Sequence, residues 1–175
     1  MRGAALMLAV AAVVGVLGGA GCKRRDRSAG APLELAAARL VIEQPDGITH
    51  VLALAADGAV TFDNEAVATL RKDGQIAIGG KLTARLSKQF KLFAHGIESN
   101  VSVLKDGIFQ INGVDELLIA EDGKVTGPLL ETMDHPRMKV EGAKLAYEGP
   151  PGARQALLVG FAVFATDLAS VPKPL

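Results

Sequence analysis

From residue 51 onward, apolar and other residues alternate on both sides of a recurring turn. Four of five successive segments carry Asp-Gly at the same place, and the third carries Gln89-Phe90 there together with one extra residue. Alternation with period two is typical of strands with one buried face, and the nearly constant spacing indicates an internal repeat of 16 residues. The five segments are 51–66, 67–82, 83–99, 100–115 and 116–131.

The same alternation predicts the turn geometry. A two-residue Asp-Gly turn would place Val60 on the face opposite Leu54, whereas a three-residue loop over 56–58 pairs the two and keeps one apolar face. We therefore predict type I turns followed by a left-handed glycine, the G1-bulge hairpin. By the same argument, odd-length loops are expected at a second set of turns, at Asn64, Gly80, Gly96 and Asn112-Gly113.

The extra residue of the third segment should move the apolar set from even to odd positions, because a shift of one residue exchanges the two faces of a strand. The apolar positions change in this way. Before the insertion they are Leu52, Leu54, Val60, Phe62, Ala68, Leu70, Ile76, Ile78, Ala84, Leu86, Leu92 and Ala94. After it they are Val101, Val103, Phe109, Ile111, Leu117, Ile119 and Val125.

These patterns predict a mainly β domain over 39–148, an antiparallel meander with roughly eleven short strands between Arg39 and Thr126. An open twisted sheet of that size tends to curl or close, so a barrel-like shape is expected. A right-angled β-solenoid with one 16-residue coil per turn is the alternative. A further hairpin around Gly142 would pair Met138 and Val140 with Leu145 and Tyr147.

The C-terminal part, 149–175, belongs to the same domain. Gly149-Pro150-Pro151 interrupts the chain, and 153–168 is predicted to form a helix with Pro151 near its start. Apolar residues lie along one stripe of this helix and on its other side, so we expect it to plug or cover the apolar side of the curved sheet. A final strand pair is the alternative. The stripe consists of Leu157, Phe161, Phe164 and Leu168.

The N-terminus has the form of a secretory signal peptide: a basic Arg2, an apolar run over 3–21 and small residues before a break. The run ends in Leu17-Gly18-Gly19-Ala20-Gly21-Cys22, which resembles the lipobox of bacterial lipoproteins. Ala20 and Gly21 fit the positions before the cysteine, whereas Gly19 departs from the usual leucine.

The resemblance implies removal of residues 1–21, lipidation of Cys22 and attachment to a membrane through the lipid. It also implies the outer membrane, because the residue after the cysteine is Lys23 rather than aspartate. Residues 22–38 would then form a flexible tether. Two alternatives are an uncleaved transmembrane anchor in the inner membrane and an ordinary buried thiol at Cys22.

Composition excludes several functions and points to none. The chain has 19 basic and 19 acidic residues and one cysteine, which argues against nucleic-acid binding, a disulfide framework and a cysteine-based metal site. His50, His95 and His135 are scattered without a metal-ligand spacing, so no metal, cofactor or catalytic residue is expected. Parity places His50 on the apolar face, where a sheet-end histidine bonded to backbone is the simplest interpretation.

Two hypotheses about function follow. The first is a non-enzymatic envelope lipoprotein whose β-repeat domain binds an envelope protein or has a structural role. Its expected contact surface is on the outer face of the sheet, at Phe93, Leu104, Ile108 and Leu118. The second is a protein or enzyme that holds a small apolar ligand between the curved sheet and the C-terminal helix, with His50 as the polar group of the pocket.

Overall fold

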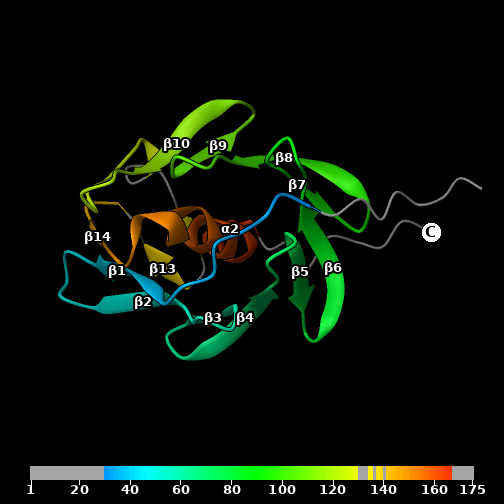
Figure 1. Cartoon of the computed structure of the whole chain (residues 1–175). Helices are drawn as coiled ribbons and strands as arrows, with labels where there is room; N and C mark the ends of the chain where they lie inside the picture. Colours follow the sequence, from blue (N-terminus) through cyan, green and yellow to red (C-terminus); the bar gives the residue numbers. More distant parts are fainter. Residues whose placement is uncertain (1–29, 130–133, 136, 140, 167–175) are drawn as a thin grey trace, which may run out of the picture.

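The protein is an antiparallel meander that curls around one helix (Figure 1). The computed structural model describes residues 30–129, 134–135, 137–139 and 141–166. Strands β1 to β11 neighbour one another in sequence order, which confirms the predicted meander and contradicts the solenoid. They are β1 (Ala38–Glu43), β2 (Thr49–Leu54), β3 (Ala59–Phe62), β4 (Glu65–Leu70), β5 (Gln75–Ile78), β6 (Lys81–Leu86), β7 (Lys91–Ala94), β8 (Ile97–Val103), β9 (Ile108–Ile111), β10 (Val114–Ile119) and β11 (Val125–Thr126).

The Asp-Gly turns between β2 and β3, and at the corresponding places further along, have the predicted geometry. Leu54 lies opposite Val60, as the three-residue loop over 56–58 requires. The amide of Gly58 donates to the carbonyl of Ala55 over 2.9 Å, and Gly58 has a φ of +92°. Glycine adopts this left-handed conformation without the steric cost that a side chain would add.

The second set of turns differs from the prediction. Both central residues have positive φ, between 50° and 83°, which is the signature of two-residue type I′ turns. The apolar face is kept by a β-bulge instead of an odd loop: Thr61 pairs with Ala66 but Val60 pairs with Ala68, so Val67 is extra. We call these turns the hairpin tips; they are Asp63-Asn64, Gly79-Gly80, His95-Gly96 and Asn112-Gly113.

The extra residue of the third segment lies in a wider bulge. Lys91 pairs with Ser102 and Phe93 pairs with Glu98, so two steps along β7 correspond to four along β8. The apolar face therefore changes parity as predicted, and Phe109, on the strand after the bulge, is completely buried. Register thus absorbs the insertion without exposing the core.

A twelfth strand, β14 (Lys144–Glu148), pairs with β1 and nearly closes the sheet into a barrel. At the opposite edge, Lys124 forms a bridge to Ala146, and the carbonyl of Gly123 accepts the amide of Tyr147 over 3.3 Å. The sequence alone gave no indication that the last Asp-Gly turn would meet this strand.

The predicted hairpin around Gly142 is wrong, because β14 pairs with β1 and not with Met138. Met138 instead lies in β13 (Met138–Lys139), which pairs with β12 (Asp134–His135). Val140 lies outside the described residues.

The helix prediction is confirmed, and the alternative of a strand pair is wrong. A short 3-10 turn, η1 (Pro151–Ala153), leads into α2 (Arg154–Ala165). Every residue of α2 from Arg154 to Phe164 is buried, because the sheet surrounds the helix (Figure 1). The expected extension to Leu168 lies outside the described residues.

Two polar side chains at the start of α2 are buried with it. Gln155 donates from Nε2 to the carbonyl of Val103 over 2.8 Å, and Arg154 donates from Nη1 to the carbonyl of Ile119 over 3.0 Å. Burial of polar groups is tolerated where they are hydrogen-bonded, so these contacts fix the helix against β8 and β10.

The segment over 30–37 corrects the expected tether. Ala31 and Leu33 are buried, and their amides donate to the carbonyls of Leu86 and Lys72 over 3.0 Å and 2.9 Å. In Figure 1 this blue segment crosses in front of α2 before it reaches β1. The part of the tether assigned to 30–37 is therefore packed against the domain, while Cys22 and residues 23–29 lie outside the described residues.

Candidate functional site

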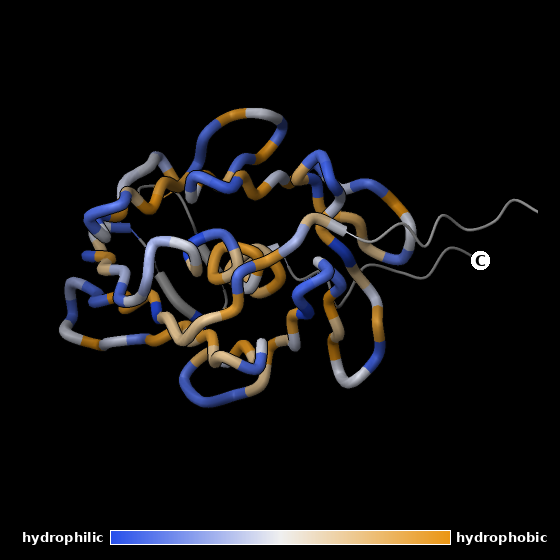
Figure 2. The backbone as a smooth tube through the Cα atoms, in the orientation of Figure 1, coloured by the Kyte–Doolittle hydropathy of each residue, from blue (hydrophilic) through white to orange (hydrophobic). Residues whose placement is uncertain are grey.

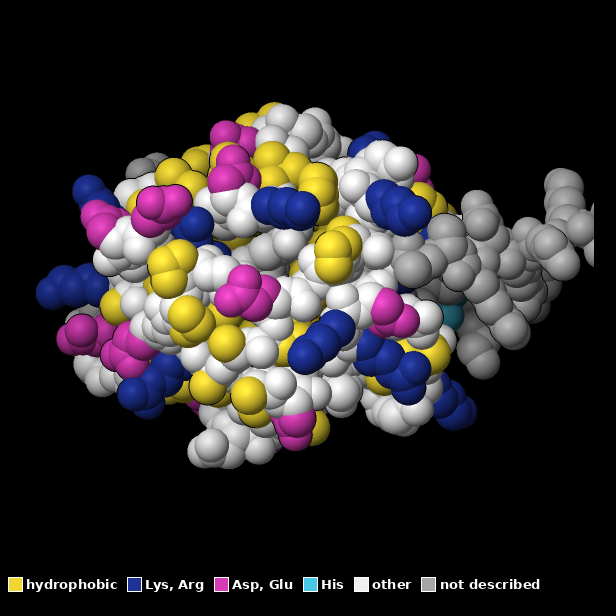
Figure 3. All heavy atoms as spheres, in the orientation of Figure 1, with side chains coloured by type: hydrophobic (Ala, Val, Ile, Leu, Met, Phe, Trp, Pro, Cys, Tyr) yellow, Lys and Arg dark blue, Asp and Glu magenta, His cyan; other side chains and the backbone are white. Residues whose placement is uncertain are grey.

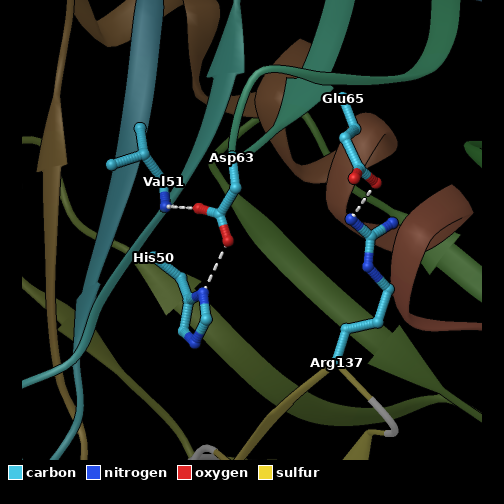
Figure 4. Close-up of polar contacts among 5 residues, drawn as sticks. All are labelled: His50, Val51, Asp63, Glu65 and Arg137. Carbon is cyan, nitrogen blue, oxygen red and sulfur yellow. Dashed lines mark hydrogen bonds and ion pairs between the residues drawn. The ribbon is translucent and has the colours of Figure 1, made fainter.

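The most concentrated polar chemistry of the described residues surrounds His50, at the start of β2 (Figure 4). Nδ1 of His50 lies 2.6 Å from Oδ2 of Asp63, in the first hairpin tip. The other carboxylate oxygen of Asp63 accepts the amide of Val51 over 2.9 Å, and the amide of Asp63 donates to the carbonyl of Val51. One tip residue thus holds both the backbone and the imidazole of β2.

The charge of Asp63 is stabilised by this arrangement. Burial alone would raise the pKa of its carboxyl, but the hydrogen bonds with His50 and Val51, together with the charges of His50 and Arg137, lower that pKa below the ordinary value of 3.8. Asp63 is therefore a carboxylate at neutral pH, and it can accept both hydrogen bonds.

Aromatic rings connect this polar group to the helix. The ring of Phe62 stacks on Phe164 of α2 with centroids 4.1 Å apart and on His50 with centroids 5.4 Å apart. The guanidinium of Arg137 lies over both phenyl rings and forms an ion pair with Glu65. The cluster joins β2, the first tip and the end of α2, which is a stabilising role that needs no ligand.

His50 is therefore not bonded to backbone as its simplest interpretation held, since its partner is a carboxylate. The space between sheet and helix near it is occupied by side chains. A Cβ at Gly160 would lie 2.8 Å from Cγ1 of Val60, so the helix backbone approaches the sheet closely there. Phe161 also packs edge-on against Phe109, with centroids 5.7 Å apart.

A shallow hollow of about 450 Å³ lies away from His50, around Arg39 on the outer side of the sheet. Arg39 forms an ion pair with Glu148 there, and Ala53 is its register partner on β2. The hollow is open to solvent and adds no support to a ligand held between helix and sheet.

The four residues predicted as a contact surface lie on the outer face, three of them as neighbours and Phe93 on another strand. Leu118 pairs with Ile108 across β9 and β10, and the amide of Leu104 donates to Ile108, so these three are neighbours. Phe93 lies on β7, where the guanidinium of Arg85 is 5.0 Å from its ring centroid. All four side chains are only partly exposed.

The large apolar residues with the greatest exposure lie elsewhere, beside turns. Ile97 and Val114 directly follow two of the hairpin tips, Leu82 lies two residues after another, and Ile48 follows the turn between β1 and β2. Between 51% and 57% of each residue is exposed. Figure 2 shows hydrophobic stretches reaching into the outward-pointing hairpins as well as surrounding the helix. We call these four residues the tip aliphatics.

Sequence reasoning missed the tip aliphatics because it assigned apolar residues to faces by parity. Ile48 has the parity of the core, yet it lies between the turn and the start of β2, and 52% of it is exposed. Their position beside turns could have identified them, because an apolar residue next to a turn glycine recurs along the sequence of the meander.

In the part of the chain that the structure describes, no three His, Cys, Asp or Glu side chains gather as metal ligands. None of the described helices has the length and apolar character needed to cross a membrane. Comparison with protein-family models, curated proteins and solved structures finds no match to this chain. The fold and its surfaces define the class: a nearly closed β-meander around a buried C-terminal helix.

Proposed function

We propose that this chain is an envelope lipoprotein whose β-repeat domain is a non-enzymatic module for binding another envelope protein. The observation that carries the proposal is the position of Cys22. It is the sole cysteine of the chain, it stands at the foot of an apolar leader, and only seven residues separate it from Gly30, where the described domain begins. A cysteine at the foot of an apolar leader has the sequence context of lipid attachment.

The tip aliphatics support the binding part of the proposal. A single exposed aliphatic residue is ordinary on a protein surface, but these four recur at the turns of separate hairpins. They lie beside turns that a rigid sheet positions, and binding residues are commonly found at such turns. His50, by contrast, has a structural role, because its imidazole is bonded to Asp63 and stacks on Phe62.

Lipid attachment is tested by metabolic labelling with radioactive palmitate. The wild-type chain should incorporate label and remain with the membrane fraction, whereas Cys22→Ala should lose both properties. Ser87→Ala serves as a control variant, since it changes a residue of the folded domain and leaves the leader and Cys22 intact. Equal labelling of wild type and Cys22→Ala would contradict the proposal.

The binding surface is tested by photocrosslinking in the native membrane. A photoreactive residue at Ile97 or Val114 should yield a discrete adduct, while the same residue at Thr69, an exposed position on the outer face of β4, should yield little. An adduct of the same mass and yield at all three positions would show that the tips have no special role.

A further inference from the structure

The anchored chain would join the folded domain at one particular place. The amide of Ala31 is bonded to Leu86 at the end of β6, and a Cβ at Gly30 would lie 2.7 Å from the carbonyl of Asp73. Gly30 is thus held between the second and third repeat turns, 71–74 and 87–90. These turns are at the opposite end of the hairpins from the tips.

The tether, even fully extended, is no longer than the domain is wide. Eight peptide steps from Cys22 to Gly30 reach less than about 30 Å even when fully extended. A domain of this size is roughly 35 Å across. A lipid on Cys22 would therefore keep the side of the domain around Gly30 close to the bilayer.

Charge on that side is unevenly distributed. Lysine occupies the first position of three successive repeat loops, at Lys72, Lys88 and Lys105, and all three side chains are exposed. The first loop has Ala56 at this position and the last has Glu121. An aspartate follows in four of the five loops, including Asp73 and Asp106 after two of the lysines, so only the loop of Lys88 has no carboxylate. In Figure 3 the right-hand part of the visible face carries mainly Lys and Arg, and the left-hand part carries both signs.

The third loop departs from the others in a way that adds to this surface. Phe90 stands where the other repeats have glycine and adopts a φ of +62°, which is rare for a bulky residue. Nζ of Lys105 lies 5.7 Å from the centroid of its ring, and the loop has no carboxylate because Gln89 replaces the aspartate. Phe90 packs in part against the core and leaves part of its ring exposed beside Lys105. Exposed phenylalanine together with lysine is typical of surfaces that lie on a membrane.

From these observations we infer that the surface formed by Lys72, Lys88, Phe90 and Lys105 faces an anionic lipid bilayer. The inference rests on the proposed lipidation of Cys22. Basic residues gain from an anionic surface only within about a Debye length of 8 Å. The tether holds the domain close enough to the bilayer for these lysines to reach that range, and their attraction to the anionic lipid would keep them there. The tips lie at the other end of the hairpins. They would therefore point away from the bilayer when this surface faces it.

The test uses the full chain purified with its lipid and reconstituted into vesicles of phosphatidylethanolamine and phosphatidylglycerol. A fluorescent thiol dye is attached to Lys88→Cys or to Lys81→Cys, which lie beyond the end and at the start of β6. Nitroxide lipids should quench the dye at 88 roughly threefold more than at 81, because about 20 Å of strand separates them. Equal quenching, or stronger quenching at 81, would overturn the inference.

Charge is tested on the same label. Lys72→Glu with Lys105→Glu should reduce quenching at 88, and so should vesicles of phosphatidylcholine alone. Lys81→Glu with Lys144→Glu, at the tip side of β6 and β14, should have no effect. If neither the Lys72→Glu with Lys105→Glu variant nor the phosphatidylcholine vesicles changes the quenching at 88, these lysines do not bind the lipid surface.

A separate measurement distinguishes failure of the proposed lipidation of Cys22 from failure of the inferred bilayer-facing surface. When Cys22 carries a lipid, the chain without an introduced cysteine takes up no dye. Dye uptake by that chain under denaturing conditions would show a free Cys22 and overturn the lipidation together with the inference. Absence of uptake combined with equal quenching at 88 and 81 would overturn the inference alone.

Discussion

The two ends of each hairpin differ in what surrounds their turns. At the Asp-Gly turns, the loop carbonyl accepts a backbone bond from a later strand: Gly58 from Leu70, Gly74 from Leu86 and Gly107 from Ile119. A Cβ at Gly58 would lie 2.1 Å from the carbonyl of Leu70. At the tips, Gly80, Gly96 and Gly113 have nothing within 4 Å of the same point.

Because of this difference, the Asp-Gly turns contribute to the stability of the fold, whereas the residues of the tips are freer to be substituted. The Asp-Gly turns are joined to their neighbours, to the segment over 30–37 and to the start of α2, so a change there disturbs several elements. The tips are held mainly by their own hairpins, and they carry the most exposed aliphatic residues. A repeat of this kind can alter its tips for a partner without disturbing the packing around the helix.

The largest effect is expected from Gly58→Ala compared with Gly80→Ala. Both residues have positive φ, 92° and 77°, so both variants carry the conformational cost of about 1 kcal/mol. Only Gly58→Ala also forces a side chain against a backbone carbonyl, which should bring its loss of unfolding free energy to about 3 kcal/mol. Urea denaturation measures both, and equal losses would remove the distinction between the two ends.

The second effect concerns buried and exposed amide side chains. Gln155→Leu should lower the free energy of unfolding by about 2 kcal/mol, because the buried carbonyl of Val103 loses its donor. Gln110, which donates to Asp115 beside a tip, is the control. Gln110→Leu should cost less than about 0.5 kcal/mol in the same urea titration. A larger loss for the control would contradict the comparison.

A smaller effect is expected at Asp63, the tip residue with the most contacts. Asp63→Asn keeps an acceptor for Val51 but removes the charge next to His50, and should cost about 1 kcal/mol near neutral pH. Because the pKa of Asp63 is lowered in the folded state, its carboxylate stabilises the fold above pH 3.8, and this contribution is lost as the pH falls through the folded pKa.

The variant should therefore lose less stability than the wild type on acidification. Urea midpoints measured from neutral pH down to about pH 2 would show this as a shallower slope. Parallel curves for the two proteins would show that the charge of Asp63 does not contribute.

The smallest effect on stability is expected from Ile97→Ser and Val114→Ser. Both side chains are more than half exposed, so each change should alter the free energy of unfolding by less than about 0.5 kcal/mol. With the photoreactive residue placed at Leu82, another of the tip aliphatics, the crosslinked adduct should nevertheless be lost in the double variant. A double variant that is markedly destabilised would place these residues in the structural part of the hairpins.

The strand pattern could be predicted because its causes are local. Alternation of apolar residues fixes which side of each strand is buried, and the G1-bulge geometry follows from the pairing of Leu54 with Val60. The tips could not be predicted in the same way, because an odd loop and a type I′ turn followed by a bulge give the same parity. Val67 shows which solution the chain uses.

The candidate surfaces depended more on distant contacts. His50 was singled out for its parity, but its partner Asp63 is 13 residues away and is brought near by a backbone bond to Val51. Parity assigns a residue to a face of the sheet but does not say whether a residue beside a turn is covered, so it does not predict the exposure of Ile48 and Leu82.

Local sequence thus established the meander, its eleven strands and the helix that follows, since period and turn chemistry act over a few residues. Only the tertiary structure decided three other features. They are the closure of the sheet by β14, the enclosure of α2 on all sides and the packing of residues 30–37 against the domain. Each joins segments far apart in the chain, and such contacts depend on the curvature that the whole sheet accumulates from its twist and bulges.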